Sequence, residues 1–574
     1  MKRDTKAGRS SAPISRRTAL KFIGVGATTL PLFGCASEIV THLATDRGDG
    51  PLITADGRDF SPIDRTLGDV APARFSGDDP ARAHRVLWDL PGYLKQKGGR
   101  IPEPSERVPL VVVGGGMSGI ITSYLLRDYR PVILERAERF GGNSRGESWR
   151  GIDYSIGAAY FMEQEEGTPI RKLFDEAGIF DICREKDGDD PVAYNGRRFD
   201  GFWDGETAPA QRAQFLRLKK YFTDTFNEQN GLRFPEIPAQ AGAERTHVNR
   251  LDREGFRAYL TRIAGGRLHP HIETALEHYC WSTFATPFAE VSAASGLNAY
   301  ASEFGKVYVA GGGNAGVAER FLERIAAVNP RENFRPGALV FDVNVVSDGV
   351  VVAYEDAVGE VRTIHAQAAV LACPKFVVAR ILRDIEPARK AAIKRLRYHS
   401  YLVANVLLDA HIPDTFYDLY MLGDGNVDHR DIAASARQHQ VTDVVLATYA
   451  KVDARRSVLT LYRGMPYAGG RAELYAPDSY ARFRAEFERQ IRTEILPLVG
   501  VAADAITDLR LSRWGHPMPV PARGLIADGV IDQLRKPFRR RVFFVEQDNW
   551  MLPAIEVCAI EALAWAPQVR RILG

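Results

Sequence analysis

The hydrophobic residues of this 574-residue chain form short runs that alternate with stretches of helical spacing. Runs of about four to eight apolar residues bounded by Gly, Pro or Asp are typical of strands buried in a sheet. Such runs lie at 108–113, 131–134, 338–345, 350–355, 369–374 and 541–545. Apolar residues at helical spacing, 117–128, stand between the first two runs. This order of strand, helix and strand predicts an α/β fold with a parallel sheet.

Three glycines connect the first predicted strand to the helix. Gly114, Gly116 and Gly119 have the spacing G-x-G-x-x-G. The first permits a tight turn, the second lets the backbone approach a pyrophosphate, and the third lets the helix pack close to the strand. The N-terminal N–H groups of the helix and its dipole then face the phosphates. The pattern predicts a Rossmann-like dinucleotide-binding unit.

The second strand of this unit ends at an acidic residue, Glu135. A carboxylate about 20 residues after the first glycine accepts hydrogen bonds from the ribose hydroxyls of a dinucleotide. It would repel a 2′-phosphate, so NADP is disfavoured. The alternative is a flexible glycine loop, but the strand, the helix and the acid stand in register with the glycines and argue against it.

The N-terminal 34 residues have the features of an export signal. Arg16 and Arg17 precede an apolar stretch, 22–34, that is too short to span a bilayer comfortably. The segment resembles a twin-arginine signal peptide, so we expect transport by the twin-arginine translocase to the periplasm; a basic tail is the alternative. Residues 32–35 resemble a lipoprotein cleavage box despite Phe33, which makes lipid attachment at Cys35 an expectation.

Composition and charge narrow the classes of protein. A 45% share of hydrophobic residues in so long a chain is enough for several cores. The formal charge is +3. Residues 1–34 hold seven basic residues and one acidic residue, so the rest of the chain has a net charge of −3, and no nucleic-acid partner is indicated. Five scattered cysteines have neither the C-x-x-C pairs nor the spacing of a metal site.

Residues 35–107 are rich in Asp, Gly, Pro and Arg, and we expect a linker or extension that packs on the body, with a helix at 81–97.

Motifs beyond Glu135 extend the dinucleotide pattern. Gly141 and Gly142 follow the acid, and the sequence GIDYSIGA occupies 151–158. Three further glycines at 311–313 precede a helical pattern, and VFFVEQDNWMLPAIEVCAIEALAWA begins at Val542. Together these segments resemble the flavin-containing amine oxidase superfamily, which includes amine oxidases, protoporphyrinogen oxidase and the carotenoid and squalene desaturases. The resemblance implies FAD, rather than NAD, as the cofactor.

The resemblance also implies how the chain is divided into domains. A discontinuous Rossmann-like FAD-binding domain would be formed by 108–165, 301–390 and 536–574. An inserted α+β substrate domain would be formed by 166–300 and 391–535. The first of these two blocks has mainly helical patterns, and the second has strand-like alternation at 401–408, 443–450 and 457–463. We expect the sheet of the second block to cover the flavin.

Residues that would contact FAD follow from the same resemblance. Val343 would meet the adenine, and Asp548 or Gln547 would meet the ribityl or pyrophosphate region. This chain has Val545-Glu546-Gln547-Asp548 where the family usually has Ala-Gly-Asp or Ala-Gly-Glu, so the choice between the last two residues stays open. The full predicted set is Gly114, Gly116, Met117, Ser118, Gly119, Glu135, Arg136, Gly141, Gly142, Arg145, Ala158, Val343, Gln547, Asp548, Ala554 and Ile555.

The sequence does not identify a catalytic residue, because the flavin performs the redox chemistry and the protein orients the substrate. Amine oxidases of the family typically have a lysine near the flavin N5, and Asn405 is the best-aligned residue here. His516 is a candidate proton acceptor, with a structural or solvated histidine as the alternative. Tyr160 and Trp550 are candidates for the cavity wall, with ordinary core packing as the alternative.

We therefore predict an exported FAD-dependent oxidoreductase that removes a hydride from a C–N or C–C bond of a small or apolar substrate. Its electrons would pass to oxygen or to a membrane acceptor. One alternative is an amine or polyamine oxidase proper that uses oxygen. The alternative from another class is a flavin-binding assembly protein without turnover.

Overall fold

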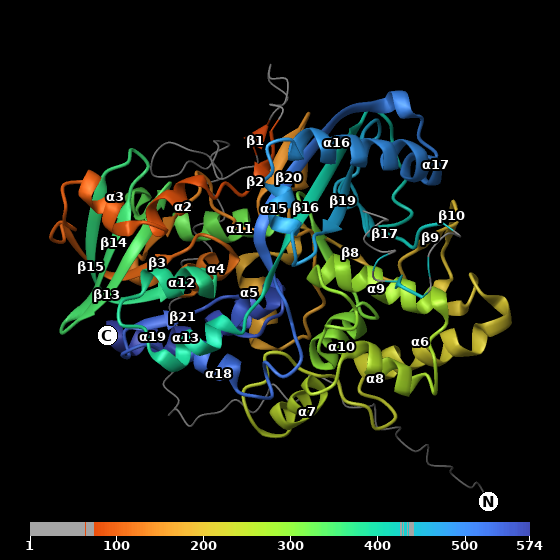
Figure 1. The fold of residues 1–574 in the computed structure, drawn as a ribbon, viewed down its shortest axis with the longest axis horizontal. Coiled ribbons are helices and arrows are strands. Elements are labelled where there is room, and N and C mark those ends of the chain that lie inside the picture. The colour runs from red at the N-terminus through yellow and green to blue at the C-terminus, as the bar shows by residue number, and fades with distance from the viewer. Residues whose placement is uncertain (1–62, 65–73, 425–427, 429, 433, 435–440) are drawn as a thin grey trace, which may run out of the picture.

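The structure is a computed structural model that describes residues 63–64, 74–424, 428, 430–432, 434 and 441–574. The twin-arginine segment and Cys35 lie outside the described residues. Two sheets, each with its own helices, lie side by side (Figure 1). The four cysteines among the described residues are free. None of the helices in the described part of the chain has the length and apolarity required to cross a membrane.

The first sheet contains the predicted dinucleotide-binding unit. Strands β4 and β15 flank β3 in parallel, and β13, β14 and β15 form an antiparallel extension. Their bounds are β3 (Glu106–Val113), β4 (Val132–Glu135), β12 (Phe334–Pro336), β13 (Leu339–Val346), β14 (Gly349–Glu355), β15 (Val361–Leu371) and β21 (Val542–Phe544). The apolar runs found in the sequence form these strands because both faces of the sheet are covered by helices.

One face of this sheet packs against four helices in a common core. They are α4 (Met117–Leu125), α5 (Pro169–Ala177), α11 (Asn314–Ala326) and α19 (Ile555–Leu573). The other face packs against α12 (Lys375–Ile381), α13 (Pro387–Lys394) and α18 (Val530–Arg535). Helix α5 thus packs in the core of this domain, whereas the division predicted from the sequence assigns its residues to the substrate domain.

The second sheet has eight strands in the order β10-β9-β17-β18-β19-β16-β20-β2. Their bounds are β2 (Ser76–Gly77), β9 (Val192–Tyr194), β10 (Arg197–Phe199), β16 (Tyr398–Leu408), β17 (Asp418–Met421), β18 (Asp443–Leu446), β19 (Ser457–Gly464) and β20 (Ile506–Pro519). Long antiparallel ladders join β16 to β19 and to β20. The alternation at 401–408 and 457–463 therefore forms strands as predicted.

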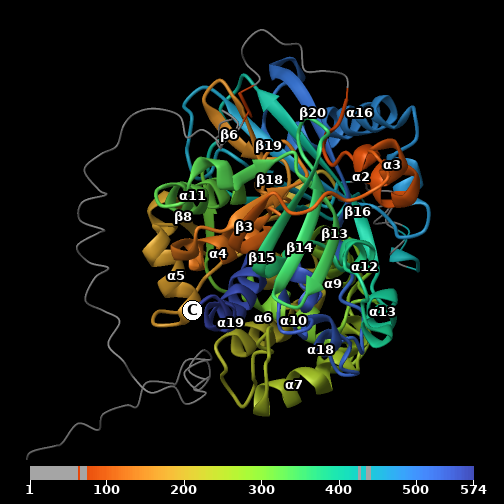
Figure 2. The ribbon, with the colours of Figure 1, turned by 90° about the vertical axis from the view of Figure 1, so that its left-hand side faces the viewer.

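Helices from the block 166–300 form a core of their own. They are α6 (Arg212–Phe226), α7 (Gly242–Asp252), α8 (Phe256–Ile263), α9 (Pro270–Phe284) and α10 (Ala293–Ser302). Of these, α9 contacts β17 and β19 of the second sheet. Figure 2 shows α6, α7 and α10 at the end of the molecule opposite β19 and β20. The block 470–499 adds α15 (Gly470–Leu474), α16 (Ser479–Gln490) and α17 (Leu496–Val499). Two small three-stranded sheets contain β1 (Ile63–Asp64), β5 (Gly146–Trp149) and β6 (Ile152–Ser155), and β7 (Phe161–Met162), β8 (Cys183–Lys186) and β11 (Val307–Ala310).

The predicted fold class, an α/β protein with a Rossmann-like domain and a second α+β region, is confirmed. Two expected elements differ in detail. The helix expected at 81–97 is divided into α2 (Ala81–Leu87) and α3 (Leu90–Gln96), because the Asp89 side chain accepts the Gly92 N–H and caps a new helix. The strand expected at 443–450 ends at Leu446.

Candidate functional site

A cavity of about 870 Å³ runs between the two sheets. It is lined by the β3–α4 turn, the end of β4, the segment 141–145 and the start of α19, all from the dinucleotide-binding side. From the substrate side it is lined by residues of α9, α10, β16, β18 and β19. This volume lies in the range of pockets that enclose most of a small ligand. The cavity joins the predicted cofactor site to the interior of the second domain.

The glycine turn is open to this cavity. A Cβ atom on Gly119 would lie 1.9 Å from the Gly114 carbonyl oxygen, so only glycine permits this helix–strand approach. Gly116 faces Gly142, whose added Cβ would lie 2.8 Å from the Gly116 Cα. Gly116 caps α4 without any side-chain hydrogen bond, so backbone N–H groups at the start of a nine-residue helix point at the cavity. This cradle suits a phosphate group.

Glu135 lies at the end of β4 and lines the cavity. Its Oε2 accepts the Gly115 N–H at 2.7 Å, and its Oε1 accepts the Ala137 N–H at 2.7 Å. A carboxylate oxygen has a second lone pair, so each remains able to accept a ribose hydroxyl. The position and the remaining acceptor capacity agree with the role expected from the sequence.

Most residues of the predicted FAD set meet at this cavity. Those that line it are Gly114, Gly116, Met117, Ser118, Glu135, Arg136, Gly141, Gly142, Arg145, Ala158, Gln547, Ala554 and Ile555. Gly119, Val343 and Asp548 do not line it. Gly119 instead allows the close packing described above. Val343 is fully buried in the sheet core, and Val340, beyond a register shift in β13, reaches the cavity in its place.

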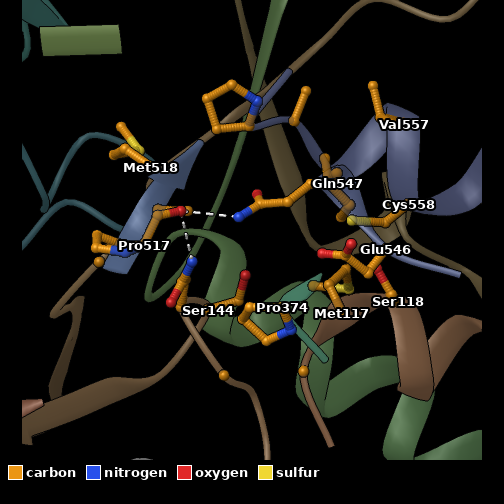
Figure 3. Close-up of a pocket in the computed structure, with 18 of the residues that line it drawn as sticks. Met117, Ser118, Ser144, Pro374, Pro517, Met518, Glu546, Gln547, Val557 and Cys558 are labelled. Atoms are coloured by element: carbon orange, nitrogen blue, oxygen red, sulfur yellow. Dashed lines mark hydrogen bonds between the residues drawn. The ribbon is translucent and has the colours of Figure 1, made fainter. Parts of the chain in front are cut away.

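Glu546 of the C-terminal motif also lines the cavity, although the sequence pattern does not single it out (Figure 3). Lys375, itself fully buried, donates to Glu546 Oε1 at 2.7 Å. Asp548 does not line the cavity, and it accepts hydrogen bonds from the Lys375 backbone N–H and the Tyr398 hydroxyl. Gln547 donates to the Pro517 carbonyl at 2.8 Å across the cavity. Of the two alternatives left open, Gln547 is therefore the one at the cavity.

The four catalytic candidates fall into two groups. Tyr160 and His516 line the cavity, whereas Asn405 and Trp550 do not. Asn405 is fully buried in β16 and its Oδ1 accepts the Thr460 hydroxyl at 2.7 Å. The β16 residues at the cavity are Tyr401 and Val403, so the expected position of Asn405 near the flavin is corrected.

Trp550 is a structural residue. Its indole N–H donates to Glu561 Oε1 at 2.8 Å, and the same carboxylate accepts three hydrogen bonds from Arg535 between 2.7 and 3.0 Å. Glu561 is fully buried, so it needs these donors.

His516 has charged neighbours that include Arg471 and Asp78, and burial lowers its pKa to about 4. It is therefore neutral near pH 7.

A group of tyrosines and carboxylates lines the cavity on the side of the second domain. This group, called the acidic pocket, consists of Tyr160, Tyr279, Tyr401, Tyr462, Glu303 and Asp443. Tyr279 and Tyr160 donate their hydroxyl hydrogens to Glu303 Oε1 at 3.0 and 3.2 Å. The sequence analysis missed the pocket, apart from Tyr160, because its members come from segments far apart in the chain.

Burial shifts the carboxyl groups of this pocket. Desolvation raises the pKa of Glu303 to about 7 and that of Asp443 to about 6. Asp418, buried beside them, has a pKa raised first by desolvation and then by Asp443. The arginines that line the cavity are Arg136, Arg145, Arg380 and Arg471, and no lysine among the described residues lines it. Lys186 lies behind this pocket, where it forms an ion pair with Asp190 at 2.7 Å and lowers the pKa of Glu303 and Asp418. One lysine faces four carboxyl groups, those of Asp190, Glu303, Asp418 and Asp443, so the acidic pocket still favours a further cation that enters from the cavity.

Comparison with known proteins supports the fold. A family model for an NAD(P)-binding Rossmann-like domain matches residues 112–177. The chain is 21% identical over 543 residues to the oxidoreductase PigB of Serratia sp. (strain ATCC 39006), and the match covers 81% of this chain and 75% of that protein. At this identity the comparison points to distant relatedness.

Solved structures share the fold over about four fifths of this chain. Wild-type putrescine oxidase bound to putrescine aligns with a TM-score of 0.59 at 16% identity, covering 81% of this chain and 99% of that one. A fatty acid isomerase from P. acnes, described as producing CLA, aligns with a TM-score of 0.56 at 14% identity, covering 80% and 98%. The chain thus has the amine oxidase fold, and the resemblance noted in the sequence holds at the level of fold.

Proposed function

We propose that this protein is an FAD-dependent oxidoreductase that removes a hydride from the carbon next to the nitrogen of an amine substrate. The observation that carries the proposal is the acidic pocket, which is joined by one cavity to the dinucleotide cradle. Glu303 and Asp443 are buried carboxyl groups. Groups of this kind are retained where a cation or hydrogen-bond donors compensate for their burial.

The cradle fits FAD. Gly114, Gly116 and the start of α4 would hold the pyrophosphate, Glu135 the adenosine ribose, and Gln547 the ribityl region. Glu546 lines the cavity beside Ser118 and forms a buried ion pair with Lys375 at 2.7 Å, which holds its carboxylate in position at the cofactor site (Figure 3). When bound, FAD accepts the hydride.

The fold alone does not choose between C–N and C–C chemistry, because it is shared with both putrescine oxidase and a fatty acid isomerase. An apolar chain would gain nothing from Glu303 and Asp443. An ammonium group would form charge-assisted hydrogen bonds with them and contact the tyrosine rings. Above its pKa of about 7, Glu303 is able to accept a proton from the ammonium, which leaves the neutral amine from which a hydride departs.

For the electron acceptor, we propose a quinone or another membrane acceptor rather than oxygen. The support is the apolar Val403 at the cavity, in the strand where the family resemblance implies a lysine that assists reoxidation. An amine oxidase that uses oxygen is the alternative. Reoxidation of the reduced protein by oxygen and by a soluble quinone, followed in parallel, separates the two: rapid oxygen consumption would contradict the proposal.

We also propose export through the twin-arginine pathway, with lipid attachment at Cys35, on the basis of residues 1–35 alone. Replacing Arg16 and Arg17 by lysine should retain the protein in the cytoplasm with its flavin bound. Cys35→Ala should release a lipid-anchored form into the soluble fraction. Unchanged export, or unchanged membrane association, would refute the respective expectation.

The test of the main proposal uses purified holoprotein. It should be yellow, release FAD on denaturation, and lose its oxidised flavin spectrum when mixed anaerobically with a suitable amine. A protein that binds flavin but is reduced by no amine, amino acid or apolar substrate would instead favour the non-catalytic alternative. Reduction of the flavin by an uncharged apolar compound, with none by amines, would contradict an amine substrate and support hydride removal from a C–C bond.

A further inference from the structure

A segment that precedes the dinucleotide-binding unit forms part of the cavity wall. This segment, called the strap, comprises residues 76–96 with β2, α2 and α3. It runs from the second sheet to the outer strands of the first sheet (Figure 1). Its residues at the cavity are Asp78, Pro80, Ala83, His84, Leu87 and Trp88. The glycine and acid motifs give no indication of this wall, and the sequence predicts only a linker or extension that packs on the body.

The first end of the strap is attached to the second sheet. Strand β2 pairs in parallel with β20, so that Ser76 stands opposite Ser512 and Gly77 opposite Arg513. The hydroxyls of Ser76 and Ser512 are 2.6 Å apart, and the Asp78 N–H donates to the Arg513 carbonyl at 2.7 Å. Gly77 has a positive φ of 88°, and a Cβ there would lie 2.4 Å from the Arg513 oxygen. Only glycine allows this contact.

The second end is attached to the antiparallel extension of the first sheet. Val86 and Tyr93 pack in one core with Leu339 and Phe341 of β13. The Tyr93 hydroxyl donates to Glu355 Oε2 at 2.7 Å. With both ends fixed to different sheets, the residues between them are held over the cavity.

Helix α2 begins beside the ribose acid. Arg82 donates to the Gly337 carbonyl at 2.7 Å. Gly337 in turn donates its N–H to Ala137, and Ala338 donates to the Glu135 carbonyl, each at 2.7 Å. This chain of contacts places the start of α2 at the end of β4, where the adenosine half of a dinucleotide binds.

Two arginines of the predicted FAD set hold the strap. Arg136 donates to Asp78 Oδ1 at 2.5 Å and to the Asp79 carbonyl at 3.1 Å. Arg145 donates to the Gly77 carbonyl at 2.8 Å and to the Gly142 carbonyl at 3.0 Å. Both side chains line the cavity, so they connect the strap to the cofactor cradle.

Trp88 is the large apolar residue of the strap that is left exposed. Its side chain is 59% exposed although it lines the cavity. The His84 ring lies 4.5 Å from the Trp88 ring, and the Arg380 guanidinium lies 3.6 Å above it. Planar groups gathered in this way form a surface on which an aromatic base stacks.

We propose that the strap is a cofactor-binding segment that covers the adenosine half of the bound dinucleotide, with Trp88 and His84 against the base. The proposal rests on FAD as the cofactor. The strap then does not act on the substrate; it slows cofactor release, because the adenosine half leaves only when the contacts of Asp78 and Arg82 open.

The experiment compares Trp88→Ala and Asp78→Asn with Lys95→Ala, an exposed residue of α3 that does not line the cavity. Holoprotein is diluted and FAD release is followed by the rise in flavin fluorescence. Loss of an aromatic contact is worth about tenfold, so Trp88→Ala should release FAD about ten times faster than Lys95→Ala. Flavin-stripped Trp88→Ala should bind ADP about tenfold more weakly and FMN with unchanged affinity.

Equal FAD release and equal ADP affinity in the two strap variants and the control would overturn the strap proposal alone. The same holds if FMN affinity falls together with ADP affinity, because the effect would then not be confined to the adenosine half. A wild-type protein that retains no FAD would overturn the proposed function itself. Trp88 is exposed, so its replacement leaves the fold intact, and circular dichroism of both variants checks this.

Discussion

The Tyr279 hydroxyl donates a hydrogen bond to Glu303 at 3.0 Å inside the cavity that also reaches the glycine turn of the dinucleotide-binding domain. Tyr279 comes from α9 and Glu303 follows the last residue of α10. The pair thus belongs to the inserted helices and faces a cofactor site built from distant parts of the chain. In the proposed function, this arrangement would place the substrate nitrogen and the cofactor in one cavity.

Replacing Glu303 by glutamine should weaken catalysis with charged amines. The substitution keeps the shape but removes the charge, and loss of one partner of a desolvated charge pair costs enough to lower kcat/KM by about a hundredfold. The change should appear in both KM and kcat, because Glu303 would bind the ammonium and also accept its proton. The matched control is Glu488→Gln on the exposed face of α16, which should leave both constants unchanged. Equal KM and kcat in the Glu303→Gln and Glu488→Gln variants would show that Glu303 does not contact the substrate.

Stability should depend on pH through the same residue. The pKa of Glu303 is about 7 in the folded protein, against an ordinary 4.5. The folded state therefore binds more protons than the unfolded state between these values, and stability falls as pH rises from about 4.5 to 7. Thermal unfolding of substrate-free protein across this range should show the fall, and Glu303→Gln should reduce it. A steeper fall in the variant would contradict the assignment.

Gly116→Val should abolish flavin binding. A Cβ on Gly116 would lie 3.5 Å from the Gly142 Cα, and the branches of valine would enter the space in front of α4. Gly311→Val is the control, because a Cβ there has no neighbour within 4 Å and the residue does not line the cavity. The flavin-to-protein absorbance ratio of each purified variant decides the outcome: a yellow Gly116→Val protein would refute the cradle.

Trp550→Phe should lower stability without changing substrate kinetics. The substitution leaves a buried Glu561 with one donor fewer, which costs about 1–3 kcal/mol. Thermal unfolding measures the loss, while kcat/KM of the surviving enzyme should match that of the wild type. A large change in kcat/KM, with little change in unfolding temperature, would restore Trp550 as a catalytic candidate.

The sequence predicted the parts of the site whose role is local. Gly114, Gly116 and Glu135 follow one another in a strand–helix–strand unit, so their positions are determined by the secondary structure. Val343 was misplaced because a register shift in β13 brings Val340 to the cavity. The position of Asn405 is wrong because the sequence shows that 401–408 forms a strand but does not show which residues of the strand reach the cavity. In the structure these residues are Tyr401 and Val403.

Other features depend on tertiary contacts alone. Tyr279 and Glu303 belong to successive helices, α9 and the end of α10, and Asp443 lies far along the chain in β18, so the three meet only through tertiary packing. The strap has the composition of a linker, and its role depends on Gly77 and Arg82 finding partners in two different sheets. The local pattern of hydrophobic and polar residues does not predict such contacts between distant elements.

In the proposed function, the dinucleotide cradle and the acidic pocket act on one amine substrate. Anaerobic reduction of the bound flavin shows this without interference from the electron acceptor, when its absorbance is followed after rapid mixing with an alkyl amine or with the alcohol of the same carbon skeleton. We expect rapid reduction by the amine, slower reduction when Glu303 is replaced by glutamine, and no reduction by the alcohol. Equal reduction by amine and alcohol, or unchanged reduction in the Glu303→Gln variant, would contradict it.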